Sequence, residues 1–180
     1  MKNKNFLLSL MLAFLPLITW AHDFSAPNAE GKIIYYNITS EIEPYTVEVT
    51  YQGEEYYEFE NRYTDTIIIP ETVTYEGMTY DITGIGSEAF KYCQKATEIH
   101  IGNKVTAIGT DAFYRTYSLN TVTFGNSVAS IGNYAFYDCT ALNSITLPAS
   151  LTTIGDQAFS YCIYNHRTTK TNQKYPSVNL

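Results

Sequence analysis

Three cysteines are the residues of this 180-residue chain best suited to covalent chemistry. Cys93, Cys139 and Cys162 lie at multiples of a 23-residue spacing, and Thr116 takes the position that is missing between the first two. This regularity favours small buried side chains that fill one slot in successive repeats, because a cysteine thiol behaves as a small hydrophobic group. A disulfide between Cys139 and Cys162 is sterically feasible, since stacked strands lie about 4.8 Å apart. Because the number of cysteines is odd, at least one thiol stays outside any disulfide within the chain.

The histidines do not supply a catalytic or metal-binding partner. A catalytic cysteine needs a histidine beside it, and neither His100 nor His166 shares the phase of the cysteines. His22 could bind copper as a mature N-terminus only with a second histidine placed on a rigid face, and the two that remain, on a solenoid strand and in the polar tail, fit that geometry poorly. No metal-spaced cluster, phosphate-binding loop or nucleophile–base pair appears. We therefore expect no enzymatic activity, no cofactor and no metal site.

Charge is unevenly distributed along the chain. Residues 22–84 contain 13 acidic and two basic residues, whereas residues 85–180 contain five acidic and seven basic ones. One acidic run comprises Glu54, Glu55, Glu58, Glu60 and Asp65. The run lacks the D-x-[DN]-x-[DN]-G pattern of a calcium loop, so a solvated face is the favoured interpretation. The absence of a clustered basic face argues against a nucleic-acid partner.

The first 21 residues resemble an export signal and not a folded element. Lys2 and Lys4 precede an apolar run from Phe6 to Ile18, and small residues around position 19–21 predict cleavage before His22. The run is shorter than the roughly 20 residues that span a bilayer, although an uncleaved anchor is the alternative. We expect a secreted or cell-surface protein with no membrane span after cleavage.

One motif recurs four times and determines the expected fold. Ile-Gly-x-x-Ala-Phe occupies residues 85–90, 108–113, 131–136 and 154–159, with a period of 23 residues and no insertion. Downstream of each phenylalanine the pattern L-x-x-I-x-I predicts a short strand with alternate residues inward. A Gly or Pro then turns the chain, and a second short stretch brings it back. Stacked coils would bury ladders of like residues, among them Phe90, Phe113, Phe136 and Phe159.

The repeat I-G-x-x-A-F-x-x-C-x-x-L-x-x-I-x-I-P-x-x-V resembles the BspA-like class of leucine-rich repeats, found in bacterial surface proteins. The resemblance covers about residues 65–164 and implies a curved solenoid of short parallel strands, with no cofactor. It also implies a role in adhesion or in recognition of host and matrix proteins. We therefore expect a mainly β fold: a leucine-rich-repeat solenoid preceded by a small antiparallel β cap.

Three segments depart from the regular coil. The acidic, tyrosine-rich residues 22–64 read as strands that could cap the solenoid core. Residues 73–82 alternate about Glu76-Gly77, which predicts a β-hairpin inserted into a degenerate first coil. After Cys162 the register supplies polar residues where apolar ones belong. Residues 165–180 are therefore a polar tail, interpreted either as the end of a truncated chain or as an unusual cap.

Outward positions of the strands are the candidate binding residues. They alternate with the inward positions and are Glu98, His100, Thr121, Thr123, Ser144 and Thr146. Repeat proteins use such exposed rows as extended binding surfaces, but Thr and Ser also suit a strand by propensity alone. We expect a non-catalytic protein-binding or adhesion module whose partner is a host or extracellular-matrix protein. The alternative is a structural spacer, or a fragment of a longer surface protein without binding activity of its own.

Overall fold

The computed structural model describes residues 22–52 and 63–162, which form two β-sheets and contain no helix. Sheet A runs in the order β1-β2-β3-β6-β8-β10-β11, with β5 paired to β6, and sheet B in the order β4-β7-β9. The strands are β1 Phe24–Pro27, β2 Ile33–Ser40, β3 Thr46–Thr50, β4 Asp65–Ile69, β5 Thr72–Tyr75, β6 Met78–Ile85, β7 Ala96–Ile101, β8 Ala107–Ile108, β9 Thr121–Thr123, β10 Ser130–Ile131 and β11 Thr153–Ile154. The predicted signal segment, most of the acidic run and the polar tail lie outside the described residues.

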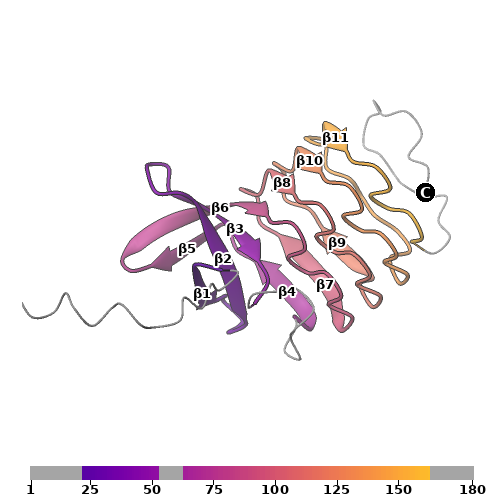
Figure 1. The fold of residues 1–180 in the computed structure, drawn as a ribbon, viewed down its shortest axis with the longest axis horizontal. Helices are drawn as coiled ribbons and strands as arrows, with labels where there is room; N and C mark the ends of the chain where they lie inside the picture. Colours follow the sequence, from indigo (N-terminus) through magenta and orange to yellow (C-terminus); the bar gives the residue numbers. More distant parts are fainter. Residues whose placement is uncertain (1–21, 53–62, 163–180) are drawn as a thin grey trace, which may run out of the picture.

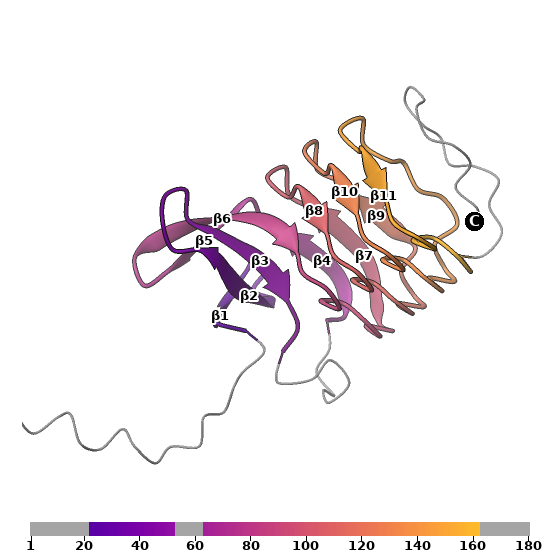
Figure 2. The ribbon, with the colours of Figure 1, turned by 45° about the horizontal axis from the view of Figure 1, so that its top comes forward.

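From β4 onward the chain winds into stacked coils, so the predicted solenoid is confirmed (Figure 1). Successive coils add short strands to the two sheets, and neighbouring strands of the solenoid pair in parallel; the β4–β7 pairing has one register shift, between Asp65 and Thr66. In sheet B, Ile67 pairs with Ile99, and Ile99 with Val122. In sheet A, β8, β10 and β11 pair in the same way (Figure 2). The inward positions of both sheets are buried, as the period-two alternation predicts.

A ladder of phenylalanine rings fills the centre of the solenoid. Phe90, Phe113 and Phe136 are fully buried, and Phe159 is nearly so. Successive ring centroids lie 5.0, 4.7 and 5.1 Å apart, with the rings within 10° of parallel. These separations are the rise from one coil to the next. The ladder places the same apolar group at the same height in every coil, which is how stacking buries a core that a single coil could not.

The turn around each phenylalanine has a backbone conformation that the sequence does not predict. Asp111 and Arg115 adopt left-handed φ values of 56° and 55°, and the corresponding residues of the other coils do the same. This conformation is uncommon for residues other than Gly, Asn and Asp. It aims the N–H groups of Asp111, Phe113 and Arg115 at carbonyls of the next coil, over N···O distances of 3.0, 2.7 and 2.8 Å. The strain is therefore offset by inter-coil hydrogen bonds.

The N-terminal strands are antiparallel among themselves, as expected, but they do not form a separate sheet. β1 pairs with β2 and β2 with β3 in antiparallel fashion, whereas β3 pairs in parallel with β6. The cap is therefore continuous with sheet A (Figure 1). The hairpin of β5 and β6 turns at Glu76-Gly77, where both residues have positive φ. Two consecutive residues in this conformation match the right-handed twist of the flanking strands.

Tyr63 attaches the cap to the solenoid. Its ring lies 4.7 Å from the ring of Phe90, at the first position of the phenylalanine ladder. Its hydroxyl accepts a hydrogen bond from the N–H of Tyr35 and donates one to the carbonyl of Thr50, each at 3.0 Å. Burial raises the pKa of this hydroxyl well above its usual value, although the Tyr35 N–H partly opposes the effect. The neutral phenol is therefore the form that the folded protein requires.

Replacement of Tyr63 by Phe should lower the free energy of unfolding by about 1–3 kcal/mol, because it leaves the part-buried N–H of Tyr35 and carbonyl of Thr50 without their partner. The pH dependence gives a second readout. The folded protein holds the phenolic proton above pH ~10, where the unfolded chain releases it, so stability falls as the pH rises through that value. Urea unfolding between pH 8 and pH 11 should show a shallower decline for the variant. An equally steep decline would contradict the assignment to Tyr63.

Candidate binding surfaces

The outward residues of sheet B form one continuous row across the coils. Thr66 pairs with Glu98 and Glu98 with Thr121, while Ile68 pairs with His100 and His100 with Thr123. In the next coil Ser144 and Thr146 flank the buried Ile145, and both are exposed. We call these residues the sheet B face: Thr66, Ile68, Glu98, His100, Thr121, Thr123, Ser144 and Thr146. Strand pairing places four of the six residues named from the sequence side by side, Glu98, His100, Thr121 and Thr123, and adds Thr66 and Ile68.

The sheet B face is polar but carries little charge. His100 Nε2 lies 3.6 Å from Glu98 Oε2, and Thr66 Oγ1 donates a 3.3 Å hydrogen bond to the same oxygen. Thr121, Thr123, Ser144 and Thr146 complete the row with short hydroxyl side chains. Short hydroxyls both donate and accept hydrogen bonds and lose little side-chain entropy when a partner covers them. The arrangement suits recognition of an extended polar surface, and it offers no nucleophile–base pair.

A second surface, a row of tyrosines at one corner of the coils, was missed by sequence reasoning. Tyr114 and Tyr137 stack with centroids 5.0 Å apart and planes 5° from parallel, and Tyr92 and Tyr161 flank them edge-on. Lys91 Nζ and Arg115 Cζ each lie 5.3 Å from the centre of the Tyr114 ring. Tyr114 and Tyr137 follow a core phenylalanine by one residue, and Tyr92 and Tyr161 by two, so the sequence shows a tyrosine near each phenylalanine but not in one repeat phase. Tyr and Arg are enriched in binding interfaces, which makes this row a secondary candidate.

Lys91 is held in this row by two carboxylates. Its Nζ lies 2.7 Å from Glu88 and 2.8 Å from Asp111, which belong to two successive coils. Burial opposes the charged form of Lys91, but the hydrogen bonds to Asp111 and Glu88 outweigh it and raise the pKa. Arg115 Nε lies 3.3 Å from a single carboxylate oxygen, Asp138 Oδ2 of the next coil. The cations are therefore largely neutralised, and the row presents tyrosine rings more than net charge.

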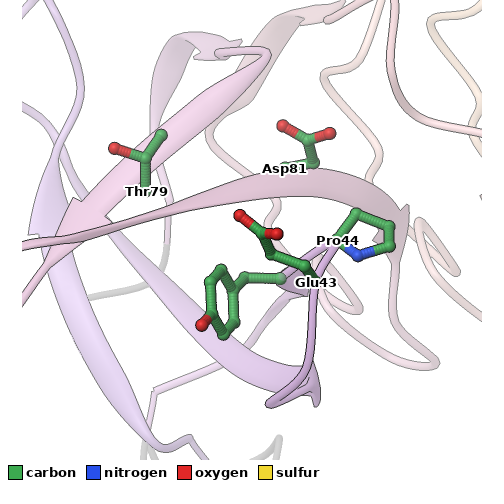
Figure 3. A pocket seen from close by; sticks show the side chains of 5 residues that line it. Glu43, Pro44, Thr79 and Asp81 are labelled. Atoms are coloured by element: carbon green, nitrogen blue, oxygen red, sulfur yellow. The ribbon is translucent and has the colours of Figure 1, made fainter.

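A third feature is an open acidic hollow beside the inserted hairpin (Figure 3). Glu43, Pro44 and Tyr45 from the β2–β3 connection face Thr79 and Asp81 of β6, around a volume of about 430 Å³. Asp81 is ion-paired with Lys104 at 2.6 Å, so Glu43 supplies most of the uncompensated charge. The hollow depends on two hairpins meeting in space, which no local pattern predicts. It brings together no residues with a recognisable catalytic arrangement.

His22 and His100 do not lie together in one site. His22 packs edge-on against Tyr35 at 4.7 Å, and burial lowers the pKa of its ring. His100 lies on β7 in the solenoid, and His166 falls outside the described residues. Among residues 22–52 and 63–162, no three His, Cys, Asp or Glu side chains are placed to hold a metal ion. Within the same residues, no helix is long and apolar enough to cross a membrane.

The fold and the exposed row together define a leucine-rich-repeat solenoid with an outward polar strand face. Residues 54–177 match the BspA type leucine-rich repeat region, in six copies, and the chain belongs to this family. The match extends beyond Cys162, although the apolar positions of the register are absent there. A comparison with curated proteins finds no match.

Solved structures support the same assignment. A leucine-rich repeat protein from Bacteroides ovatus is 39% identical over 78% of this chain, with a TM-score of 0.66. The chain spans only 33% of that protein. A leucine-rich repeat protein from Bacteroides capillosus is 27% identical over 82% of this chain and 99% of its own length, with a TM-score of 0.63. The pneumococcal vaccine antigen PcpA shares the fold, with a TM-score of 0.60 at 24% identity.

Proposed function

We propose that this chain is an exported, non-catalytic protein-binding module that acts through the sheet B face. The observation that carries the proposal is the outward row from Thr66 to Thr123, held in register by strand pairing and by the phenylalanine ladder beneath it; Ser144 and Thr146 are exposed in the next coil. A rigid, repeated surface binds without the entropic cost of ordering loops. The N-terminal sequence supports export, and an exported module of this kind would meet host or extracellular-matrix proteins.

Replacement of Thr121, Thr123, Ser144 and Thr146 by Lys should weaken capture of a matrix protein by about tenfold or more. Four long cations would prevent close approach over the centre of the sheet B face. The measurement is affinity capture from extracellular-matrix extract, with the wild-type chain and the variant as baits in parallel. A matched control places four lysines on the sheet A side, at Ala107, Thr110, Ser130 and Thr153. The control should retain binding, and equal loss in both variants would refute the assignment of the face.

A second candidate function is that of a structural spacer within a larger surface assembly. The observation that favours it is the length of the Bacteroides ovatus relative, of which this chain spans 33%. A spacer needs the stacked core but no specific surface. The two functions differ in the capture experiment. Capture of no matrix protein by the wild-type chain supports the spacer, whereas capture that the sheet A control retains supports the binding module.

A further inference from the structure

The row of small side chains beside the phenylalanine ladder reaches from each coil to the one before it. Thr116 Oγ1 donates a 3.0 Å hydrogen bond to the carbonyl of Phe90. Cys139 Sγ donates in the same way to Phe113 at 3.0 Å, and Cys162 Sγ to Phe136 at 3.1 Å. Each side chain therefore points toward the preceding coil, so Cys162 faces the coil of Cys139, whereas Cys139 must rotate away from the Phe113 carbonyl to meet Cys162. The thiols occupy the same slot as the hydroxyl of Thr116.

Two cysteines are adjacent in this row, and their turns are held close together. The N–H groups of Phe136 and Asp138 donate to Ala158 and Ser160 of the next coil, at 2.7 and 2.8 Å. Asp138 directly precedes Cys139, and Ser160 lies two residues before Cys162. The bonds therefore hold the two cysteine-bearing turns side by side. The coil spacing here, given by the Phe136–Phe159 centroid distance, is 5.1 Å. A disulfide requires Cα atoms about 4.4–6.8 Å apart, and this spacing lies within that range.

The two thiols differ in a way that favours an ordered reaction. Cys139 is fully buried, and burial raises the pKa of its thiol. Cys162 is only partly buried, and its neighbour Cys139 lowers the pKa of its thiol despite the opposing effect of burial. The thiolate is the nucleophile in disulfide exchange. Cys162 is therefore the residue that reacts first with an external oxidant.

We propose that Cys139 and Cys162 form an intrachain disulfide that staples the last two described coils together in the exported protein. This inference rests on the export stated under the proposed function, because disulfides persist in oxidising compartments. The structure holds both residues as thiols. The neighbour of Cys93 in the row is Thr116, so Cys93 has no adjacent cysteine there. The bond would restrict the unfolded chain through a closed loop from residue 139 to residue 162.

The oxidant is a disulfide-bearing compound, such as oxidised glutathione or a thiol oxidase with a reactive disulfide. The Cys162 thiolate attacks one sulfur of that disulfide, forms a mixed disulfide and releases one thiolate of the oxidant. Cys139 then loses its proton to solvent, and its thiolate attacks the sulfur of Cys162 and displaces the second thiolate. The pair loses two protons and two electrons, and the oxidant's disulfide becomes two thiols.

Thiol counting on the purified full chain in a glutathione redox buffer tests the bond. Alkylation in denaturant should modify only Cys93 before reduction and all three cysteines after it, with a peptide linking residues 139 and 162 in the mass spectrum. The variants Cys139→Thr and Cys162→Thr, which copy Thr116, should each expose both remaining thiols before reduction. Cys93→Thr should expose none. Alkylation of all three wild-type cysteines before reduction would overturn the staple and leave the proposed binding function standing.

The same count on protein recovered from the exported fraction of expressing cells separates the bond from export. A linked peptide there supports the staple in the exported protein. Reduced Cys139 and Cys162 in that fraction, from a chain that forms the bond in glutathione buffer, would overturn its formation in the exported protein. A chain found only in the cytoplasm would overturn the export on which this inference and the proposed function both rest.

Discussion

Replacement of Phe113 by Ala should lower the free energy of unfolding by about 3–5 kcal/mol. Phe113 is fully buried and lies between Phe90 and Phe136, with centroid distances of 5.0 and 4.7 Å. Truncation removes the burial of one ring and also the stacking contacts on both of its faces. The surrounding coils cannot close the cavity without breaking register, because inter-coil hydrogen bonds fix their separation. Urea unfolding followed by circular dichroism measures the loss.

Two further variants make this prediction specific to the ladder. Phe113→Leu keeps most of the buried volume and should cost less than Phe113→Ala. Phe159→Ala removes a ring with one described phenylalanine neighbour, at 5.1 Å, and should also cost less than the central truncation. A loss below about 1 kcal/mol for Phe113→Ala would show that the ladder is not the core that holds the coils together.

Replacement of Gly132 by Ala should cost about 3 kcal/mol, near the upper end of the range for overpacking. An added Cβ at Gly132 would lie 2.7 Å from both the carbonyl carbon of Gly109 and the nitrogen of Thr110. Both atoms are backbone of the preceding coil, so no side chain can move aside. The regular spacing of the coils must increase locally, and the hydrogen bond from the Gly132 N–H to the carbonyl of Ile108 must lengthen.

Gly84→Ala is the matched control, since it makes the same change in the unfolded chain. At Gly84 the nearest atom to an added Cβ is the Cβ of Glu48, at 3.3 Å, and it belongs to a side chain. This variant should stay within about 1 kcal/mol of the wild type. Thermal unfolding of both variants provides the comparison. Equal stability of Gly132→Ala and Gly84→Ala would mean that close approach of the coils is not the reason for glycine in the repeated Ile-Gly motif.

Much of the solenoid could be predicted from sequence because each coil repeats one pattern of burial. The period located the phenylalanine ladder, and the alternation about Ile99 separated inward from outward residues. The turn conformation could not be predicted, because Asp111 and Arg115 adopt left-handed backbone without the glycine that usually marks it. This conformation is stabilised by hydrogen bonds to the next coil, which are contacts between residues far apart in the sequence. The same holds for the pairing of β3 with β6 and for the hydroxyl of Tyr63.

The candidate site was predictable to the extent that it depends on strand alternation. Glu98 to Thr146 follow from the repeat, whereas Thr66 and Ile68 needed the observed pairing of β4 with β7. The tyrosine row was missed because its geometry depends on the left-handed turns. The hollow at Glu43 and Asp81 was missed because its two walls come from different hairpins. Surface residues that lie on one repeated strand can thus be predicted from the sequence. A surface formed where separate elements meet cannot.

Site-specific photo-crosslinking tests most directly whether the sheet B face is the binding surface. A photoreactive phenylalanine analogue is placed at Thr123 on that face in one variant, and at Thr153 on the sheet A side in another. Each chain is then irradiated with extracellular-matrix extract, and covalent adducts are identified by mass spectrometry. The sheet B assignment predicts matrix-protein adducts from position 123 and none from position 153. Adducts that arise only from position 153, or equally from both, would contradict it.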